Sequence, residues 1–315
     1  MTGNAPFPPE LVFIKKLFTK ILRFLTLSIG LLAFVESSTA AELPFGKGVL
    51  WHVSKDGQDP SIIFGTIHSS ERRVVDFGAE ALKLLATSDS LLVDIVDDDS
   101  IKQKLFSVML YQDNRRLDEL VSADTFEKIK VLGYEYGYLA RQMKVLKPWA
   151  ARGVFSSPPS EASRISLGIR TISQTLQDFA QNKGIAIIAL QTVEEQLASL
   201  ESANEQEQIA LLDTLPSNIG SIEAKYLETL ELYLQNDTSG MYQQMLDGYT
   251  IISDDFSNRY VSGLVTQPNH RMVQRMQNAL AQGNSFVAID ALHLPGEEGI
   301  LSLLQAQGYT IRPME

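Results

Sequence analysis

Short apolar runs of the kind that form buried strands lie near both ends of the chain. They are rich in β-branched and aromatic residues and are bounded by turn-forming residues, which favours strands over helices. The runs are GVLWHVS (48–54), SIIFGTI (61–67), SLLVDIV (90–96), IAIIAL (185–190) and SFVAID (285–290). After the last of them, the pattern predicts a loop, a helix and a final strand.

Helical patterns fill the intervals between these runs. Apolar residues fall at helical spacing over residues 79–86, and residues 98–143 and 192–281 have mainly helical character. Residues 172–184 predict a helix that ends at its final glycine. The segment SSPPSEAS (156–163) is the strongest candidate for an exposed loop. Strands that alternate with helices around a central helical region predict an α/β fold with a mixed β-sheet core and flanking helices.

Two of the four histidines follow apolar strands in the same setting. Segment 61–96 has the order strand, GTIH turn, helix, strand, and segment 285–312 repeats this order with DALH in the turn. The similarity predicts two pseudo-related strand-GxxH-helix-strand units. If a symmetry axis relates them, His68 and His293 face one another across a shared cleft at the strand ends, where ligands commonly bind.

The first forty residues have the composition of an export signal. Four basic residues between positions 15 and 23 precede the apolar run FLTLSIGLLAFV (24–35), and the small residues SSTAA follow. The apolar run is shorter than the ~20 residues that a membrane-spanning helix needs, which favours a signal peptide at 1–40 over an uncleaved anchor. We therefore expect one domain over 41–315, periplasmic or secreted, without a membrane span after cleavage.

The charge balance argues against a nucleic-acid partner. The chain has 27 Lys and Arg against 38 Asp and Glu, of which four and two lie within residues 1–40. The remaining 23 basic and 36 acidic residues give a net charge of −13. Such a surface repels phosphate backbones, and no basic stripe offsets it. Cysteine is absent, which excludes disulfides and thiol chemistry.

The paired histidines and a carboxylate inside an apolar run are candidates for a metal site. Neutral imidazole is a common ligand of divalent metals, and two imidazoles with one carboxylate leave positions open for water. Asp94 interrupts the run 90–96, where burial of a carboxylate is costly unless it is paired or bound to a metal. Each residue also has a structural alternative: a histidine bonded to backbone at a strand end, and an acid that caps a helix or pairs with Lys or Arg.

Several motifs in a fixed order resemble those of the TraB/GumN family, whose animal relatives are the Tiki proteins. These motifs are FGTIHSS (64–70), ALKLLATSDSLLVDI (81–95), LKPWAA (146–151), LQTVEEQL (190–197) and ALHLPGEEGILSLLQAQGYTIRP (291–313). The resemblance extends from about residue 48 to residue 313.

The resemblance implies an α/β fold of the erythromycin-esterase/ChaN-like type with two GxxH motifs. In the Tiki branch, which contains metal-dependent proteases, the histidines of these motifs and an acid serve a divalent metal. On this sequence the resemblance makes His68 and His293 the metal-ligating histidines and Asp94 the acid. The ion would be divalent, with Mn, Co and Zn as the candidates, and the resemblance implies a peptide or protein as the substrate.

Four positions depart from the family pattern. Asp290 replaces the glycine of the second GxxH motif, and Asp94 is one methylene shorter than the usual Glu. Gln191 stands where an acid is usual, and Pro268 where an arginine is usual. Replacing glycine by aspartate removes backbone freedom next to His293 and adds a carboxylate that ligates an ion or orients the ring.

Two functions of different classes remain open at the level of the sequence. In the first, the chain is a metal-dependent hydrolase in which the ion lowers the pKa of bound water. Asp94, Glu71 and Asp290 are then the catalytic candidates, with Glu71 or Asp290 as general base. In the second, the same fold is a non-catalytic binding protein whose metal site has decayed. The paired motifs favour the first, and the departures together with the Glu- and Gln-rich segment 192–213 favour the second.

Overall fold

A computed structural model of the chain describes residues 43–97, 105 and 107–314. The signal peptide predicted at 1–40 lies outside the described residues, and the single domain over 41–315 stays a prediction. No helix in the described part of the chain is long and apolar enough to cross a membrane.

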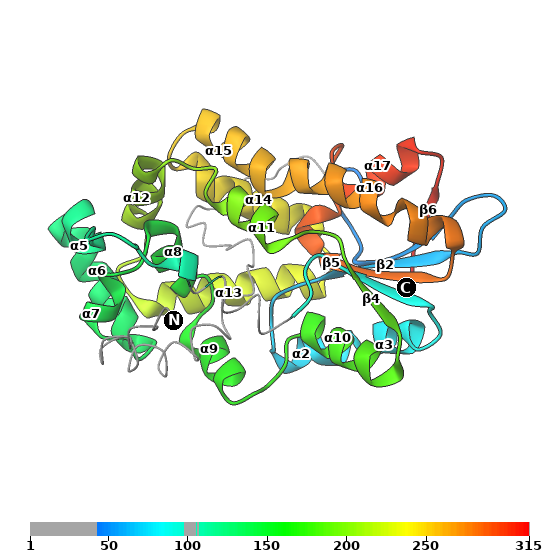
Figure 1. Ribbon diagram of the computed structural model, residues 1–315, viewed down its shortest axis with the longest axis horizontal. Helices are drawn as coiled ribbons and strands as arrows, with labels where there is room; N and C mark the ends of the chain where they lie inside the picture. Colours follow the sequence, from blue (N-terminus) through cyan, green and yellow to red (C-terminus); the bar gives the residue numbers. More distant parts are fainter. Residues whose placement is uncertain (1–42, 98–104, 106, 315) are drawn as a thin grey trace, which may run out of the picture.

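Six strands form one mixed sheet at one end of the molecule (Figure 1). They are β1 (Leu50–Ser54), β2 (Ser61–Thr66), β3 (Ser90–Val93), β4 (Ala186–Ala189), β5 (Ser285–Asp290) and β6 (Thr310–Pro313). Their order in the sheet is β4-β3-β5-β2-β1-β6. β4, β3, β5 and β2 are parallel to one another, whereas β1 is antiparallel to both β2 and β6. The parallel strands β5 and β2 therefore occupy the centre.

Helices cover both faces of the sheet (Figure 1). Those on one face are α2 (Arg72–Phe77), α3 (Ala79–Leu85) and α10 (Ile172–Lys183), and those on the other are α16 (Gln267–Gln282) and α17 (Ile300–Ala306). Side chains alternate between the two layers, as the period of two in a strand requires. Phe64 and Phe286 pack into the first layer, and Ile63 and Val287 into the second.

A block of helices with its own core extends the molecule away from the sheet (Figure 1). The helices of this region are α5 (Leu117–Leu120), α6 (Ala123–Glu135), α7 (Ala140–Met143), α8 (Pro148–Val154), α9 (Pro159–Ser166), α11 (Val193–Leu200), α12 (Glu205–Asp213) and α13 (Ile219–Leu234). Helices α14 (Thr238–Thr250) and α15 (Asp254–Val261) pack in the core beside the sheet instead. The long helix α13 connects the two parts, because Ile222 packs in the core of the block and Tyr233 in the core beside the sheet.

The predicted fold class is confirmed, since a mixed sheet with flanking helices and a central helical region is present. The two pseudo-related units are not confirmed. β5 alone separates β2 from β3 in the sheet, whereas both β2 and β1 separate β5 from β6. The expected exposed loop at 156–163 is also wrong. Most of it belongs to the start of α9, where Pro159 occupies the first turn, a position that needs no backbone N–H, and Glu161 is fully buried.

Candidate functional site

The carboxyl ends of parallel strands bring the predicted site residues to one edge of the sheet. Thr66 at the end of β2 pairs with Asp290 at the end of β5, and β3 lies on the other side of β5. His68 follows β2, Asp94 follows β3, and His293 follows β5 within three residues. In open α/β sheets this edge is where ligands bind, so all of these residues lie at the place where a ligand is expected.

Asp94 directly follows β3, Asp290 ends the adjacent strand β5, and the negative charge of Asp94 acts on Asp290. The backbone N–H groups of Ile95 and Asp290 both interact with the Asp94 carboxylate, and Ile95 N lies 2.8 Å from Oδ1. The Asp290 carboxylate accepts a hydrogen bond from the backbone N–H of Leu292, 2.9 Å from Oδ1. Main-chain donors therefore hold both carboxyl groups in place.

Burial raises the pKa of both carboxyl groups toward neutrality. The pKa of Asp94 rises to about 6 because burial disfavours the charged form, although the neighbouring N–H groups act in the opposite direction. The pKa of Asp290 rises to about 7 through burial, with a further contribution from the negative charge of Asp94. The charge of Asp94 therefore favours the protonated form of Asp290 near neutral pH.

A buried asparagine of α16 orients the ring of His293. The ring Nδ1 lies 2.6 Å from Oδ1 of Asn269, and Nδ2 of the same amide donates to the Glu298 carbonyl at 2.7 Å. Because the amide nitrogen is directed at Glu298, the amide oxygen accepts from His293, so Nδ1 carries the proton and Nε2 the lone pair. Burial lowers the pKa of His293 to about 4, which makes the ring neutral at pH 7.

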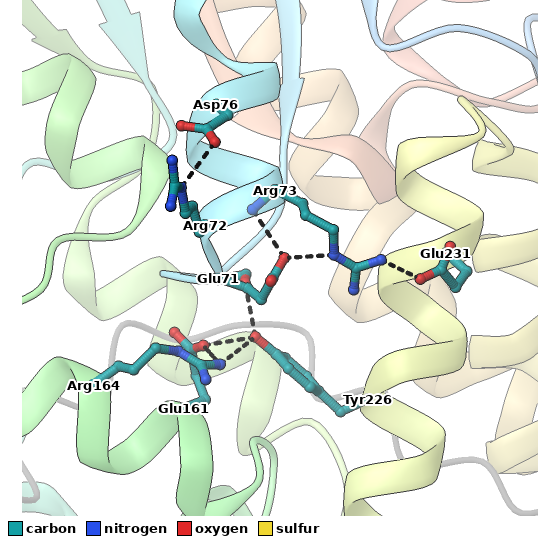
Figure 2. A network of polar contacts seen from close by, with 9 residues as sticks. Glu71, Arg72, Arg73, Asp76, Glu161, Arg164, Tyr226 and Glu231 are labelled. Carbon is teal, nitrogen blue, oxygen red and sulfur yellow. Dashed lines mark hydrogen bonds and ion pairs between the residues drawn. The ribbon is translucent and has the colours of Figure 1, made fainter.

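The loop that carries His68, between β2 and α2, is held by a fully buried carboxylate from α9 (Figure 2). Oε1 of Glu161 accepts from the backbone N–H of Ser70 at 2.6 Å. Oε2 accepts from the Tyr226 hydroxyl at 2.6 Å and from Arg164 at 2.6 Å. Helices α9 and α13 thus both bind the loop that follows β2.

Ser69 extends this network within the same loop. Its hydroxyl lies 2.7 Å from the Tyr226 oxygen, and it is the donor there because the Tyr226 proton is already directed at Glu161. The charges that act on His68 come from two places, Glu161 in α9 and Asp97 in the segment after β3. Burial lowers the pKa of His68, whereas the negative charges of Glu161 and Asp97 raise it.

Gly65, the first residue of GTIH, permits the close approach of two turns. A Cβ atom at this position would lie 2.6 Å from Cδ1 of Leu294 and 3.1 Å from Cα of Ala291. The carbonyl of Gly65 also accepts a hydrogen bond from Tyr233 at 2.8 Å. A larger residue here would therefore displace the Leu294 side chain and η2 (Ala291–His293), the turn that contains the second motif histidine.

Three other residues singled out in the sequence have structural contacts. Glu71 caps α2: its carboxylate accepts from the backbone N–H of Arg73 at 3.1 Å and pairs with the Arg73 Nε at 3.2 Å (Figure 2). The backbone N–H of Gln191 donates to the Asp94 carbonyl at 2.9 Å, and its buried Oε1 has no hydrogen-bond partner in the described part of the chain. Pro268 lies in the first turn of α16.

The described residues do not gather into a metal-binding group of three or more His, Asp or Glu side chains. The chemistry of the donors is suitable, because neutral His293 has a free lone pair on Nε2 and carboxylates lie at the same edge. Asp94 and Asp97 both follow β3, and the charge of Asp97 raises the pKa of His68 whereas that of Asp94 raises the pKa of Asp290. The described residues thus do not show His68, His293 and Asp94 gathered around one ion, and a divalent metal there stays a prediction.

The fold and the arrangement of the turns at this sheet edge define a class of α/β proteins. In this class, two GxxH-type turns meet at the carboxyl ends of central parallel strands. The sequence model of the TraB/PrgY/gumN family matches residues 49–313, so the chain belongs to the TraB/PrgY/gumN family. This confirms the resemblance seen in the motifs. No curated protein matches the chain.

Sequence reasoning missed the residues that hold the two histidine turns, namely Glu161, Tyr226, Tyr233 and Asn269. For the two tyrosines a signal was available: with Leu230 they fall at positions i, i+4 and i+7 of one apolar helix face. Glu161 gave no such signal, because an acid after two prolines is typical of a solvated loop.

Substitution of Gly65 by alanine tests the close approach of the two turns. We expect Gly65→Ala to lower the free energy of unfolding by about 1–3 kcal/mol, because the added methyl group forces η2 away from β2. Urea unfolding measures the change. Gly220 in α13 is the matched control, since a Cβ there meets only Asn218 Oδ1, at 3.3 Å, and Gly220→Ala should not destabilise the chain. Equal stability of Gly65→Ala and the parent protein would contradict the close contact.

The raised pKa values also predict how stability depends on pH. Folded pKa values of about 6 and about 7 exceed the ~3.9 of an unfolded aspartate, so the folded state binds more protons between these values. The contribution of these two groups to the free energy of unfolding is fully present below pH ~4 and is lost as the pH rises through 6 to 7.

Substitution of Asp290 by asparagine should remove most of the loss of folding stability that accompanies rising pH. At pH 8 we expect Asp290→Asn to be about 1–3 kcal/mol more stable than the parent, after allowance for partial solvent screening, with a smaller difference at pH 5. Urea unfolding at both pH values is the measurement. Asp89→Asn, at the exposed amino end of β3, is the control. A pH-independent effect of Asp290→Asn would show that this carboxyl group titrates normally.

Proposed function

We propose that this protein is a hydrolase in which Asp94 and Asp290 act together as general base and general acid on a peptide or amide bond. The observation that carries the proposal is that Asp94 and Asp290 lie at the carboxyl ends of the adjacent strands β3 and β5, where the main-chain N–H of Asp290 interacts with the Asp94 carboxylate. Paired carboxyl groups whose surroundings separate their pKa values are a recurrent arrangement for acid–base chemistry at neutral pH.

The pair can supply both proton transfers of amide hydrolysis. Near pH 7 one carboxyl group is ionised and the other protonated, with Asp94, the group of lower pKa, as the ionised one. Asp94 takes a proton from a water molecule while the oxygen of that water bonds to the carbonyl carbon of the substrate. Asp290 then gives its proton to the amide nitrogen as the carbon–nitrogen bond breaks. Groups with a pKa near the working pH are the most efficient in such transfers.

His293 serves as an orienting group in this proposal. Its Nδ1–H is directed at Asn269, which fixes the ring and leaves Nε2 to accept a hydrogen bond from the attacking water or from a substrate N–H. The peptide or amide substrate class comes from the resemblance to the Tiki proteins.

A divalent ion is the second candidate for activating the water. His293 is held in a tautomer with a free Nε2, and a second partner on the other ring nitrogen is typical of ligating histidines. A cation would also relieve the repulsion between the two ionised carboxylates. Mn, Co or Zn at His68, His293 and Asp94 would follow the resemblance, but no proton transfer above depends on it.

We further propose that residues 1–40 direct export, so that the mature chain meets peptides in the periplasm. A non-catalytic binding protein is the alternative class. The uncharged Gln191 at a position where the family usually has an acid favours that alternative, and the assay below separates the two.

The test is peptide hydrolysis by the purified mature chain. A mixture of proteome-derived peptides is incubated with it, and new termini are identified by mass spectrometry between pH 4 and 9. We expect cleavage with an optimum near pH 6–7, reduced about 100-fold or more in Asp94→Asn and Asp290→Asn because each removes a proton-transfer group. Asp89→Asn is the matched control and should retain activity.

The other outcomes separate the candidates. Undiminished cleavage by both asparagine variants would reject the acid–base pair. About one divalent ion per chain by elemental mass spectrometry, lost in His68→Ala and His293→Ala together with activity, would favour the metal candidate. Neither cleavage nor bound metal, even after addition of Mn, Co or Zn, would favour a binding protein.

A further inference from the structure

A polar pocket lies in the helical block, where the segment that follows residue 110, the start of α8 and the start of α12 meet. Its volume is about 270 Å³. The side chains that the argument uses come from three separate segments of the chain and are Tyr111, Arg115, Lys147, Trp149, Glu201 and Glu205. None of them belongs to the proposed catalytic edge.

We propose that this pocket binds a small zwitterion of the size of a free α-amino acid. The carboxylate of the ligand would bind Arg115 and Lys147, and its ammonium group would bind Glu201 and Glu205. This site is independent of the proposed hydrolysis and goes beyond it.

The four charged side chains of the pocket form two ion pairs, and each pair has one cationic and one anionic member. Arg115 Nη1 lies 2.9 Å from Glu205 Oε2, and Lys147 Nζ lies 2.9 Å from Glu201 Oε1. A ligand with a single charge would satisfy one member of each pair and leave the other without a partner. A ligand with both charges can bridge all four groups, which is why the arrangement favours a zwitterion.

Both ion pairs are open enough to exchange partners. The side chains of Arg115 and Glu205 are 52% and 42% exposed, and those of Lys147 and Glu201 are 29% and 43% exposed. Ion pairs this exposed contribute at most about 1 kcal/mol each, so their separation by a ligand costs little. Arg115 stays oriented in the process, because Asp113 holds its Nε at 2.9 Å.

Aromatic rings supply the walls of the pocket. The guanidinium of Arg115 lies over the ring of Tyr111, 4.5 Å from its centroid, which presents the charge in a fixed plane. Trp149, which is largely buried in the core of the block, lines the pocket beside Lys147. These rings can pack against the apolar part of an amino acid while the charged groups hold its backbone atoms.

Tryptophan fluorescence provides a direct test, because the chain has two tryptophans and Trp51 is buried in the sheet. In the full chain with Trp51→Phe, the signal reports on Trp149 alone. L-phenylalanine is the probe, with 3-phenylpropanoate and 2-phenylethylamine as analogues that lack the ammonium or the carboxylate group. Calorimetric titration of the unsubstituted chain repeats the measurement without relying on Trp51→Phe.

We expect saturable binding of L-phenylalanine with a micromolar to millimolar Kd, and at least about tenfold weaker binding of either analogue. Arg115→Gln and Lys147→Gln should weaken binding by about tenfold or more. Arg116→Gln is the matched control. Arg116 is the next residue, but it pairs with Asp118 and Glu119, and its substitution should leave Kd unchanged. Equal binding of all three probes, no saturable signal up to millimolar L-phenylalanine, or equal effects of Arg115→Gln and Arg116→Gln would overturn the proposal.

Discussion

The parallel pairing of β2 with β5 joins two segments that lie far apart in the chain, and the candidate site is built on it. Thr66 donates to the Ile289 carbonyl at 3.2 Å across 223 positions of sequence. Because the two strands run in the same direction, the turns after them meet at one edge, and β3 brings Asp94 to the same edge from the other side of β5. A slip of this register by one residue would turn Asp290 to the opposite face of the sheet. The acid pair thus depends on the central strand pairing.

The helices fix the direction of the side chains at this edge. Glu161 from α9 is a fully buried carboxylate, and its cost is offset because a main-chain N–H, a hydroxyl and a guanidinium all donate to it. It holds the loop after β2, while Asn269 from α16 sets the tautomer of His293 after β5. Each motif turn is therefore oriented by a polar group from a different helix, so the geometry of the edge couples the sheet to the helical block.

Much of the fold followed from local patterns in the sequence. The five apolar runs all contain strands, and the GTIH and DALH motifs lie at one sheet edge as their position after parallel strands requires. What could not be predicted depends on long-range packing. The two pseudo-related units were not confirmed, because local similarity in the sequence does not determine the order of strands in a sheet. The burial of Glu161 could not be predicted because two of its three partners, Ser70 and Tyr226, are distant in the sequence. The close approach to Gly65 arises only when η2 packs against β2.

The central claim is that the two aspartates titrate together near neutral pH, and carbon-13 NMR of the aspartate side-chain carboxyl carbons tests it most directly. Spectra of the protein labelled at these carbons are recorded from pH 3 to 9, and Asp94→Asn and Asp290→Asn assign the two signals. We predict midpoints near 6 for Asp94 and near 7 for Asp290, with the remaining Asp290 midpoint lowered in Asp94→Asn because the neighbouring charge is gone. Midpoints of both groups close to the ordinary ~4 of aspartate would contradict the account.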